Sequence, residues 1–346
     1  MRTRRPLLAA LALPFAVSAL AAQERQVLTG ANPSIYNLAG EVRVEAGSGP
    51  DVTVEVNRAG ADARKLEVRL RSGQLSIVYP DDQVVYRAGR NRWGSSNLRV
   101  RDDGTFGGDW SSGMSGRRVT VRGSGSGLEA WADLVVRVPR GRSVAVHLAV
   151  GEVAVTNVDG DLDLDVYSAS VRATGTKGKL TVDAGSGSVR VDGATGELSV
   201  DTGSGGIEIA DVTMTRITLD AGSGSVEGRN VKAERFSADV GSGGVDVEGS
   251  IADELLVDTG SGSVRLDLAV VPRSLEIDTG SGGATIRLPA TANADLDIET
   301  GSGGITSDFA ITAETFRRDE LRGRIGSGGG RITVSTGSGG VRLVKR

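Results

Sequence analysis

The sequence predicts an all-β protein, a right-handed parallel β-solenoid of about ten rungs of 18–21 residues with an irregular N-terminal β cap. A glycine-rich turn recurs along the C-terminal half, and apolar residues alternate with polar ones on both sides of each turn. Composition excludes the other glycine-rich classes. The 346 residues include 51 Gly but only 8 Pro, 38% are hydrophobic, and no Gly-X-Y period is present, so neither collagen nor a low-complexity chain fits.

A phrase of the type Asp-Thr-Gly-Ser-Gly-Gly marks each predicted rung. Its first glycine falls at positions 185, 203, 222, 241, 260, 280, 301 and 337, which gives spacings of 18, 19, 19, 19, 20, 21 and 36 residues. The last spacing contains an insertion, residues 311–325, which we expect to cover the end of the solenoid. Two degenerate copies, at 149–151 and 167–169, extend the pattern backwards, so the units run from near Val144 to Leu343.

Each unit reads as two short strands whose apolar residues form columns when the copies are stacked in sequence order. The column before the turn contains Leu180, Leu198, Ile217, Phe236, Leu255, Leu275, Leu296 and Ile332. The column after the turn contains Val189, Ile207, Val226, Val245, Val264 and Ile305. A unit of this length cannot bury its apolar side chains alone, whereas stacked units bury them against one another. The columns are therefore the predicted core.

The turn glycines have a mechanical explanation. A flat rung must reverse direction within about four residues, which favours positive φ and leaves little room for a Cβ atom. A phosphate-binding loop is excluded because none of these turns contains Gly-Lys-Ser/Thr at the start of a helix. The calcium-binding nonapeptide pattern is also absent, because no Asp lies at its required distance from the glycine pair.

The first 21 residues read as a secretory signal peptide. Arg2, Arg4 and Arg5 precede an apolar run over 7–20, and the small residues of 19–21 fit a signal peptidase site. The run is too short for a membrane span, which needs about 20 residues. We therefore expect an exported protein, periplasmic, on the cell surface or extracellular, with no transmembrane segment in the mature chain.

Three further segments are expected after the leader. Residues 22–85 form a β-rich cap or irregular first rungs, residues 86–130 a Gly/Ser/Arg-rich insert, and residues 131–346 the solenoid. A cap is expected because the open end of a solenoid exposes unpaired strand edges.

The insert is the candidate ligand-binding site. Arginine interleaved with tryptophan can bind polyanions or sugars by charge pairing and stacking. The candidate residues are Arg87, Arg90, Arg92, Trp93, Arg99, Arg101, Trp110, Arg117 and Arg118. Envelope or host glycans, anionic polymers and other envelope proteins are the partners considered. Nucleic acid is not expected for a chain of net charge −4. The alternative is a mobile loop that its arginines keep soluble.

A column of carboxylates is the second candidate. Two residues before each turn stand Asp183, Asp201, Asp220, Asp239, Asp258, Asp278 and Glu299. Stacked at about 4.8 Å, such like charges repel one another. The row either accepts hydrogen bonds from the turn N–H groups or binds Ca²⁺ weakly through its oxygen ligands. The second alternative describes a calcium-stabilised extracellular rod, and no other cofactor is expected.

A catalytic function is not expected. His147 is the sole histidine and falls at the first position of the Asp column, with no Cys or second His to join it. Nothing distinguishes one serine among the repeated turns. Carboxylates and arginines are plentiful, so a polysaccharide lyase or hydrolase on a β-helix stays an alternative, and a concave groove where they converge would favour it.

Three segments carry a resemblance to a known family. They are Leu38-Ala39-Gly40-Glu41-Val42-Arg43-Val44, then Val138-Pro139-Arg140-Gly141, then the Gly-Ser-Gly-x-Val units that end with Gly329 to Val341. This order resembles the bacterial β-strand-repeat family labelled putative adhesin, a domain of unknown function. The resemblance covers nearly the whole mature chain. It implies an exported, non-catalytic β-solenoid with an adhesive or envelope role, and it carries over no site residues. The insert lies outside the family pattern.

Overall fold

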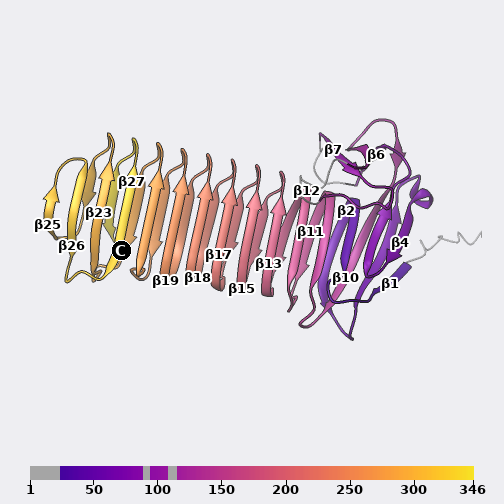
Figure 1. Ribbon diagram of the computed structural model, residues 1–346, viewed down its shortest axis with the longest axis horizontal. Helices are drawn as coiled ribbons and strands as arrows, with labels where there is room; N and C mark the ends of the chain where they lie inside the picture. Colours follow the sequence, from indigo (N-terminus) through magenta and orange to yellow (C-terminus); the bar gives the residue numbers. More distant parts are fainter. Residues whose placement is uncertain (1–23, 89–93, 108–114) are drawn as a thin grey trace, which may run out of the picture.

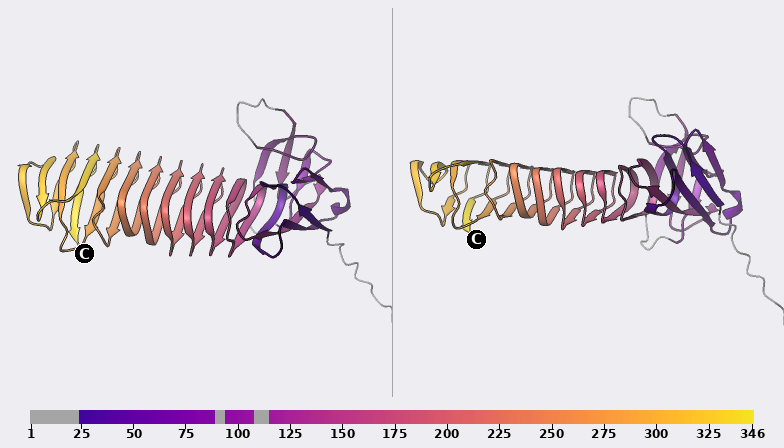
Figure 2. Two further views of the ribbon diagram at one scale, coloured as in Figure 1. Left: turned by 60° about the horizontal axis from the view of Figure 1, so that its bottom comes forward. Right: turned by 90° about the horizontal axis from the view of Figure 1, so that it is seen from below.

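A computed structural model describes residues 24–88, 94–107 and 115–346. The described chain is built from β-strands and one turn of 3-10 helix, η1 (Ala63–Lys65). The strands form a long rod of stacked rungs that widens into a more irregular β structure at its N-terminal end (Figures 1 and 2). The predicted signal peptide lies outside the described residues. No helix in the described part of the chain is long and apolar enough to span a membrane.

The wide end combines antiparallel strands with the first parallel pairings. Its strands are β1 (Glu24–Leu28), β2 (Ser34–Gly47), β3 (Val52–Ala59), β4 (Glu67–Arg71), β5 (Gln74–Val78) and β10 (Trp131–Pro139). Strand β3 pairs antiparallel with β1 and β10, and β4 pairs antiparallel with β5. Strand β2 pairs parallel with β5, with β10 and with β11 (Val144–Thr156). Through β2, this end therefore continues directly into the rungs.

A buried polar cluster joins these N-terminal strands. The Tyr79 hydroxyl lies 2.9 Å from Asn37 Oδ1 and donates to the Ala39 carbonyl at 3.0 Å. The Asn37 amide in turn donates to the carbonyl of Ala132 in β10 at 2.7 Å. Both side chains are fully or almost fully buried, and burial raises the pKa of Tyr79. Because each buried polar group here has a partner, the cluster fixes β2 against β10.

The described part of the insert contains strands. Its strands β7 (Ser95–Val100), β8 (Arg117–Arg122) and β9 (Leu128–Glu129) form a four-stranded sheet with β6 (Gln83–Val85), which lies just before the predicted start of the insert; the strand order is β7–β8–β6–β9. Val100, Val119 and Val121 are buried, and they belong to the same apolar core as the rungs. The described part of the insert is therefore packed onto the wide end of the rod.

The rungs stack in parallel and in register. The long strands β11, β12 (Leu162–Thr174), β18 (Val226–Val240) and β19 (Val245–Thr259) run through both faces of the flattened coil. The others are β13 (Lys177–Ala184), β14 (Val189–Asp192), β15 (Thr195–Thr202), β16 (Ile207–Ala210), β17 (Thr213–Ala221), β20 (Val264–Leu268), β21 (Ser274–Thr279) and β22 (Ala284–Leu288). Leu180 pairs with Leu198 and Leu198 with Ile217, as the column predicted.

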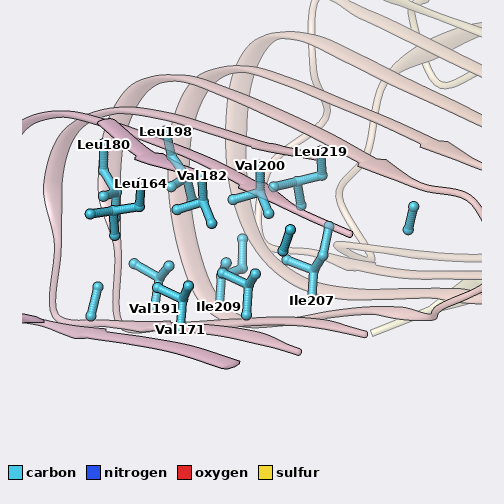
Figure 3. Packing of buried hydrophobic residues seen from close by; sticks show 14 of the residues in the cluster. Leu164, Val171, Leu180, Val182, Val191, Leu198, Val200, Ile207, Ile209 and Leu219 are labelled. Carbon is cyan, nitrogen blue, oxygen red and sulfur yellow. The ribbon is translucent and has the colours of Figure 1, made fainter. Parts of the chain in front are cut away.

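The core lies between the two faces. Figure 3 shows Leu164, Leu180 and Leu198 on one side, facing Val191 and Ile209 on the other. These side chains are 0–2% exposed. The predicted β-solenoid is thus confirmed as an all-β coil with columns of like residues inside, whereas its handedness and its number of rungs stay predictions.

The turn glycines are required by close backbone contact and not by positive φ. None of the first glycines from Gly185 to Gly301 is among the described glycines at positive φ, so that part of the prediction is wrong. A Cβ on Gly205 would instead lie 1.8 Å from the carbonyl oxygen of Gly187 on the preceding rung. A Cβ on Gly224 would lie 1.9 Å from the carbonyl oxygen of Gly205. Neighbouring turns therefore approach more closely than any side chain permits.

The C-terminal strands do not stack in sequence order. They are β23 (Ala294–Thr300), β24 (Ile305–Ser307), β25 (Ile311–Phe316), β26 (Glu320–Ile325), β27 (Gly330–Thr336) and β28 (Val341–Lys345). Strand β27 lies between β21 and β23, and β28 lies between β22 and β24. Ile332 therefore sits between Leu275 and Leu296, and the predicted order of this column is wrong at its end.

The insertion over 311–325 covers the end of the rod, as predicted. It forms the antiparallel hairpin β25–β26, in which β26 pairs with β23. The hairpin is the last layer at the C-terminal end in Figure 1. The antiparallel pairing interrupts the parallel stack and leaves β25 as the edge strand.

Substitution of one turn glycine tests the close stacking. We expect Gly224→Ala to lower the melting temperature by about 3–10 °C, because overpacking typically costs 1–3 kcal/mol and the obstructing atom is backbone. Ser223→Ala, at an exposed position of the same turn, should leave the melting temperature unchanged. Thermal unfolding followed by circular dichroism measures both variants. Equal melting temperatures for Gly224→Ala and the wild type would show that the turns are not in contact.

Candidate functional site

One face of the β7–β8 hairpin presents the exposed arginines of the insert. In the antiparallel register, Arg99 lies directly opposite Arg118. Both side chains are exposed, while Val100 and Val119 beside them point into the core. Arg99 donates to the Gly116 carbonyl at 3.1 Å. Within the described part of the chain, neither arginine forms an ion pair. Two guanidinium groups that have no ion-pair partner among the described residues thus share one outward face.

The other predicted arginines of the insert are engaged in structural contacts. Arg87 forms an ion pair with Glu129 at 2.7 Å. Arg117 contacts the Asp82 carboxylate and the Tyr79 carbonyl. Arg101 donates to Thr105 Oγ1 at 3.2 Å and to the Gly107 carbonyl at 3.0 Å. Arg90, Arg92, Trp93 and Trp110 lie outside the described residues. Of the predicted ligand-binding set, the structure therefore brings Arg99 and Arg118 together at the surface.

Aromatic contacts fix the insert to the first rungs. The Phe106 ring meets the edge of Tyr36 with a centroid separation of 5.8 Å and an interplanar angle of 84°. Tyr36 stacks on His147 at 4.1 Å with the planes 1° apart. A hydrogen bond of 2.9 Å between the hydroxyls of Ser96 and Ser168 adds a second attachment. The arginine face is thus held in a defined position at one end of the rod.

The carboxylate column begins at this attachment. Register places His147 beside Asp165 and Asp165 beside Asp183, and His147 Nδ1 lies 3.1 Å from Asp165 Oδ2. His147 thus lies at the head of the column, as its sequence position predicts, whereas Tyr36 and Asp165 were not among the predicted residues. Tyr36 and Asp165 could have been found from the sequence by aligning the strands before the regular repeat, because both residues share the register of His147.

The column then continues along the rod as a row of aspartates. Its consecutive members are Asp165, Asp183, Asp201, Asp220, Asp239, Asp258 and Asp278. Glu299 is not the next member, because the insertion of β27 places Ser335 between Asp278 and Glu299. The predicted ladder is therefore interrupted before its last residue.

The expected turn-capping role of these carboxylates is wrong. Within the described chain, no turn N–H group donates to a column carboxylate between Asp183 and Asp278. The N–H of Gly203 instead donates to the Ala184 carbonyl of the preceding rung at 3.0 Å. Where a buried Thr follows the Asp, as at Thr202, Thr259 and Thr279, that Thr bonds to the turn instead: Thr202 Oγ1 donates to the Gly205 carbonyl at 2.7 Å. The carboxylates are left facing solvent and each other.

Burial and mutual repulsion weaken the acidity of aspartates in the column. Burial together with the flanking carboxylates raises the pKa of Asp183, of Asp220 and of Asp258. For Asp220 the flanking groups are Asp201 and Asp239. No group of three or more His, Asp or Glu side chains in the described part of the chain is arranged to hold a metal ion. Weak calcium binding by the column stays a prediction.

A groove on the opposite face was not anticipated. Its volume is about 570 Å³, and it crosses the rungs from Ser225 to Arg342. Glycines form part of its lining, namely Gly244, Gly283, Gly304 and Gly340. Along it lie Glu227, then Asp246, which pairs with Arg265 at 2.9 Å. A recurring Gly at the last turn position is the sequence signal that could have indicated it.

Strand insertion also determines the charge in this groove. Arg342 lies between Thr285 and Thr306, whereas stacking in sequence order would have placed the two threonines side by side. Carboxylates and arginines from different rungs therefore do converge in a concavity, which is the feature named above as favouring the enzyme alternative.

Neutralising one ladder residue tests the repulsion. A carboxyl group whose pKa is raised by folding stabilises the fold fully below its unfolded pKa, about 3.9 for Asp, and this contribution is lost as pH rises through the raised value. Asp220→Asn should therefore raise the melting temperature at pH 7 and low salt, by about 2 °C. The gain should vanish at pH 3 and in 1 M NaCl.

The matched control is Asp192→Asn, because register places Asp192 between Thr174 and Ala210, which are uncharged. We expect no gain from this variant. A gain of equal size in both variants, or one that persists at pH 3, would contradict repulsion along the column.

Comparisons with known proteins give one family match and one structural match. The family model described as Toastrack DUF4097 matches residues 108–344. A crystal structure of a putative cell adhesion protein from Clostridium sporogenes matches with 8% identity over 94% of this chain and 100% of that chain, at a TM-score of 0.21. That TM-score is too low to support an argument about the fold. None of the curated proteins compared is similar enough to count as a match. Because the family model spans more than half of the chain, the protein belongs to the Toastrack DUF4097 family.

Proposed function

We propose that the protein is an exported, non-catalytic, adhesin-like β-solenoid of the bacterial envelope, which binds anionic polymers or glycans through the Arg99–Arg118 face. The observation that carries this proposal is the exposed cross-strand pair of arginines, which has no carboxylate partner among residues 24–88, 94–107 and 115–346. Like charges directly opposite each other destabilise a strand pair. A bound anion would relieve that repulsion, because each guanidinium can bind a carboxylate, sulfate or phosphate in a bidentate manner.

A second arginine pair on the rod shows what a purely structural arrangement looks like. Arg216 and Arg235 are also exposed and adjacent in register. Glu197 flanks Arg216, and Glu254 flanks Arg235. This pair is therefore neutralised within its own column, whereas the pair on the insert is not. The difference in charge balance favours the insert as the contact site.

Replacement of both insert arginines tests the proposal. We expect Arg99→Gln/Arg118→Gln to weaken binding to heparin or polygalacturonate by at least about tenfold, because hydrogen bonds to charged groups contribute about 1.5–3 kcal/mol each. Wild-type binding should weaken as salt rises. Arg216→Gln/Arg235→Gln is the matched control and should retain wild-type affinity. Affinity that is unchanged in the insert variant, or reduced equally in both variants, would refute this site.

The second candidate is a carbohydrate-active enzyme, and the groove favours it. Glu227, Asp246 and Arg265 line the groove on consecutive rungs and Arg342 lies nearer its end, and a linear glycan could cross the rungs there. One observation argues against catalysis. Glycosidases need one protonated carboxylic acid to donate a proton to the leaving group, whereas the Asp246 carboxylate forms an ion pair with Arg265, which favours its ionised form.

Incubation with polyuronates and neutral glycans separates the two candidates. Under the binding proposal, neither unsaturated products nor new reducing ends appear. Turnover that is present in the wild type and absent from Asp246→Asn would establish the enzyme. Turnover that is equal in both proteins would point to a contaminant or to another site, and turnover abolished by Arg99→Gln/Arg118→Gln would place the chemistry at the insert.

A further inference from the structure

The final strand pair occupies a slot between two rungs that precede it in the chain. Strand β27 separates β21 from β23, and β28 separates β22 from β24. On one column, Leu275 pairs with Ile332, and Ile332 pairs with Leu296. The rung built from residues 330–345 is thus inserted into a stack whose other members from β11 to β24 follow the sequence.

The two rungs that border the slot are also suited to stack on each other. Residues 274–283 read Ser-Leu-Glu-Ile-Asp-Thr-Gly-Ser-Gly-Gly, and residues 295–304 read Asp-Leu-Asp-Ile-Glu-Thr-Gly-Ser-Gly-Gly. Apolar residues, turn Thr and turn glycines fall at the same places in both. An emptied slot could therefore close by direct pairing of β21 with β23, in the same register that joins the other rungs.

The connections support this second arrangement. Five residues, 269–273, link β20 to β21, and this connection advances the chain by one rung. The link between β22 and β23 is also five residues long, 289–293, but it spans two rungs because β27 lies between. A connection of the usual length is thus sufficient for direct stacking.

Electrostatics favours the inserted state near neutral pH. Thr333 separates Glu276 from Asp297, and Ser335 separates Asp278 from Glu299. Direct stacking would bring both like-charged pairs to about one strand spacing, 4.8 Å, and Arg322, which pairs with Asp297 at 3.2 Å and with Glu299 at 2.7 Å, would offset part of the repulsion. High salt reduces that penalty and therefore shifts the balance toward the closed slot.

The slot is selective for the chain's own sequence. A Cβ on Gly337 would lie 2.2 Å from the Gly280 carbonyl oxygen, and a Cβ on Gly339 would lie 2.0 Å from that of Gly282. An occupant must therefore supply a Gly-Ser-Gly turn between two strands of matching apolar pattern. The segment leading into β27 is glycine-rich, with Gly326, Gly328 and Gly329 all at positive φ, and can serve as a hinge.

We propose that β27–β28 is an exchangeable rung: it can leave its slot, which closes as β23–β24 stacks on β21–β22, and it can enter the same slot of a second copy of this chain. Reciprocal exchange joins two rods by their C-terminal ends and preserves the contacts of the inserted rung in both copies. The partner is a second copy because the slot accepts this turn and this strand spacing. This proposal does not depend on the function of the insert.

Paired cysteines distinguish the two stackings in a chain that has no cysteine of its own. Glu276→Cys/Thr333→Cys places the thiols on adjacent strands, within disulfide reach, only while the rung is inserted. Glu276→Cys/Asp297→Cys places them on adjacent strands only when the slot is closed, since otherwise the two strands are about 9.6 Å apart. We expect the first disulfide to form at low salt and the fraction of the second to increase in 1 M NaCl on mild warming.

The second pair removes one of the repelling carboxylate pairs and so makes closure easier. Failure of its disulfide to form, under conditions where the first pair oxidises, would overturn the closed state.

Mixing of single-cysteine chains tests the exchange. Glu276→Cys chains incubated with Thr333→Cys chains should yield disulfide-linked dimers at a rate that rises with salt. Ser237→Cys occupies the same outward column at mid-rod, so its mixture with Thr333→Cys should give dimers at a rate at least tenfold lower. Equal dimer yields in both mixtures, or none in either, would overturn exchange between copies.

Discussion

Close contact between successive turns is the constraint on which the rest of this structure depends. The parallel strands hold the rungs at one spacing, and the turns must follow at that spacing or the strands lose their register. Carbonyl oxygens therefore lie where a Cβ of the next turn would be, as at Gly205 and Gly224. The repeated glycines are thus a requirement of stacking, and the nearly fixed distance between them in the sequence follows from it.

Stacking in register also brings like residues together, with opposite consequences inside and outside the coil. Inside, a column of Leu, Ile and Val buries apolar surface against neighbours of the same kind. Outside, a column of one charge repels itself. The groove face reduces this repulsion through ion pairs, as where Glu208 contacts both Arg190 and Arg229. The Asp column lacks such partners over most of its length, and burial together with the flanking carboxylates raises the pKa of Asp183, Asp220 and Asp258.

The sequence predicted the structure correctly wherever a residue pattern was compatible with only one position in the fold. The apolar columns and the hairpin over the C-terminal end could be predicted, because alternation and a break in the period are local signals. The order of the last rungs could not, since residues 274–283 and 295–304 are almost interchangeable as neighbours. Turn chemistry was predicted incorrectly for a related reason: Asp and Thr both precede the turns that begin at Gly203, Gly260 and Gly280, and only the burial of the Thr shows that it, and not the Asp, bonds to the turn. The arginines of the insert could be found by composition, but only their ion pairs separate Arg87 and Arg117 from Arg99 and Arg118.

The same constraint explains why the arginine face and the exchangeable rung lie near the two ends of the rod. A rung in the middle contacts a similar rung on each side, so a side chain placed there to bind a ligand must also fit both neighbours. At the N-terminal end the stack meets a different sheet, and the insert can present Arg99 and Arg118 without fitting into a column. At the C-terminal end the parallel stack stops at an antiparallel hairpin, and one rung has two similar sequences beside it. The two ends therefore differ from the surface between them because their residues need not match the repeat, and not because they contain more charged residues.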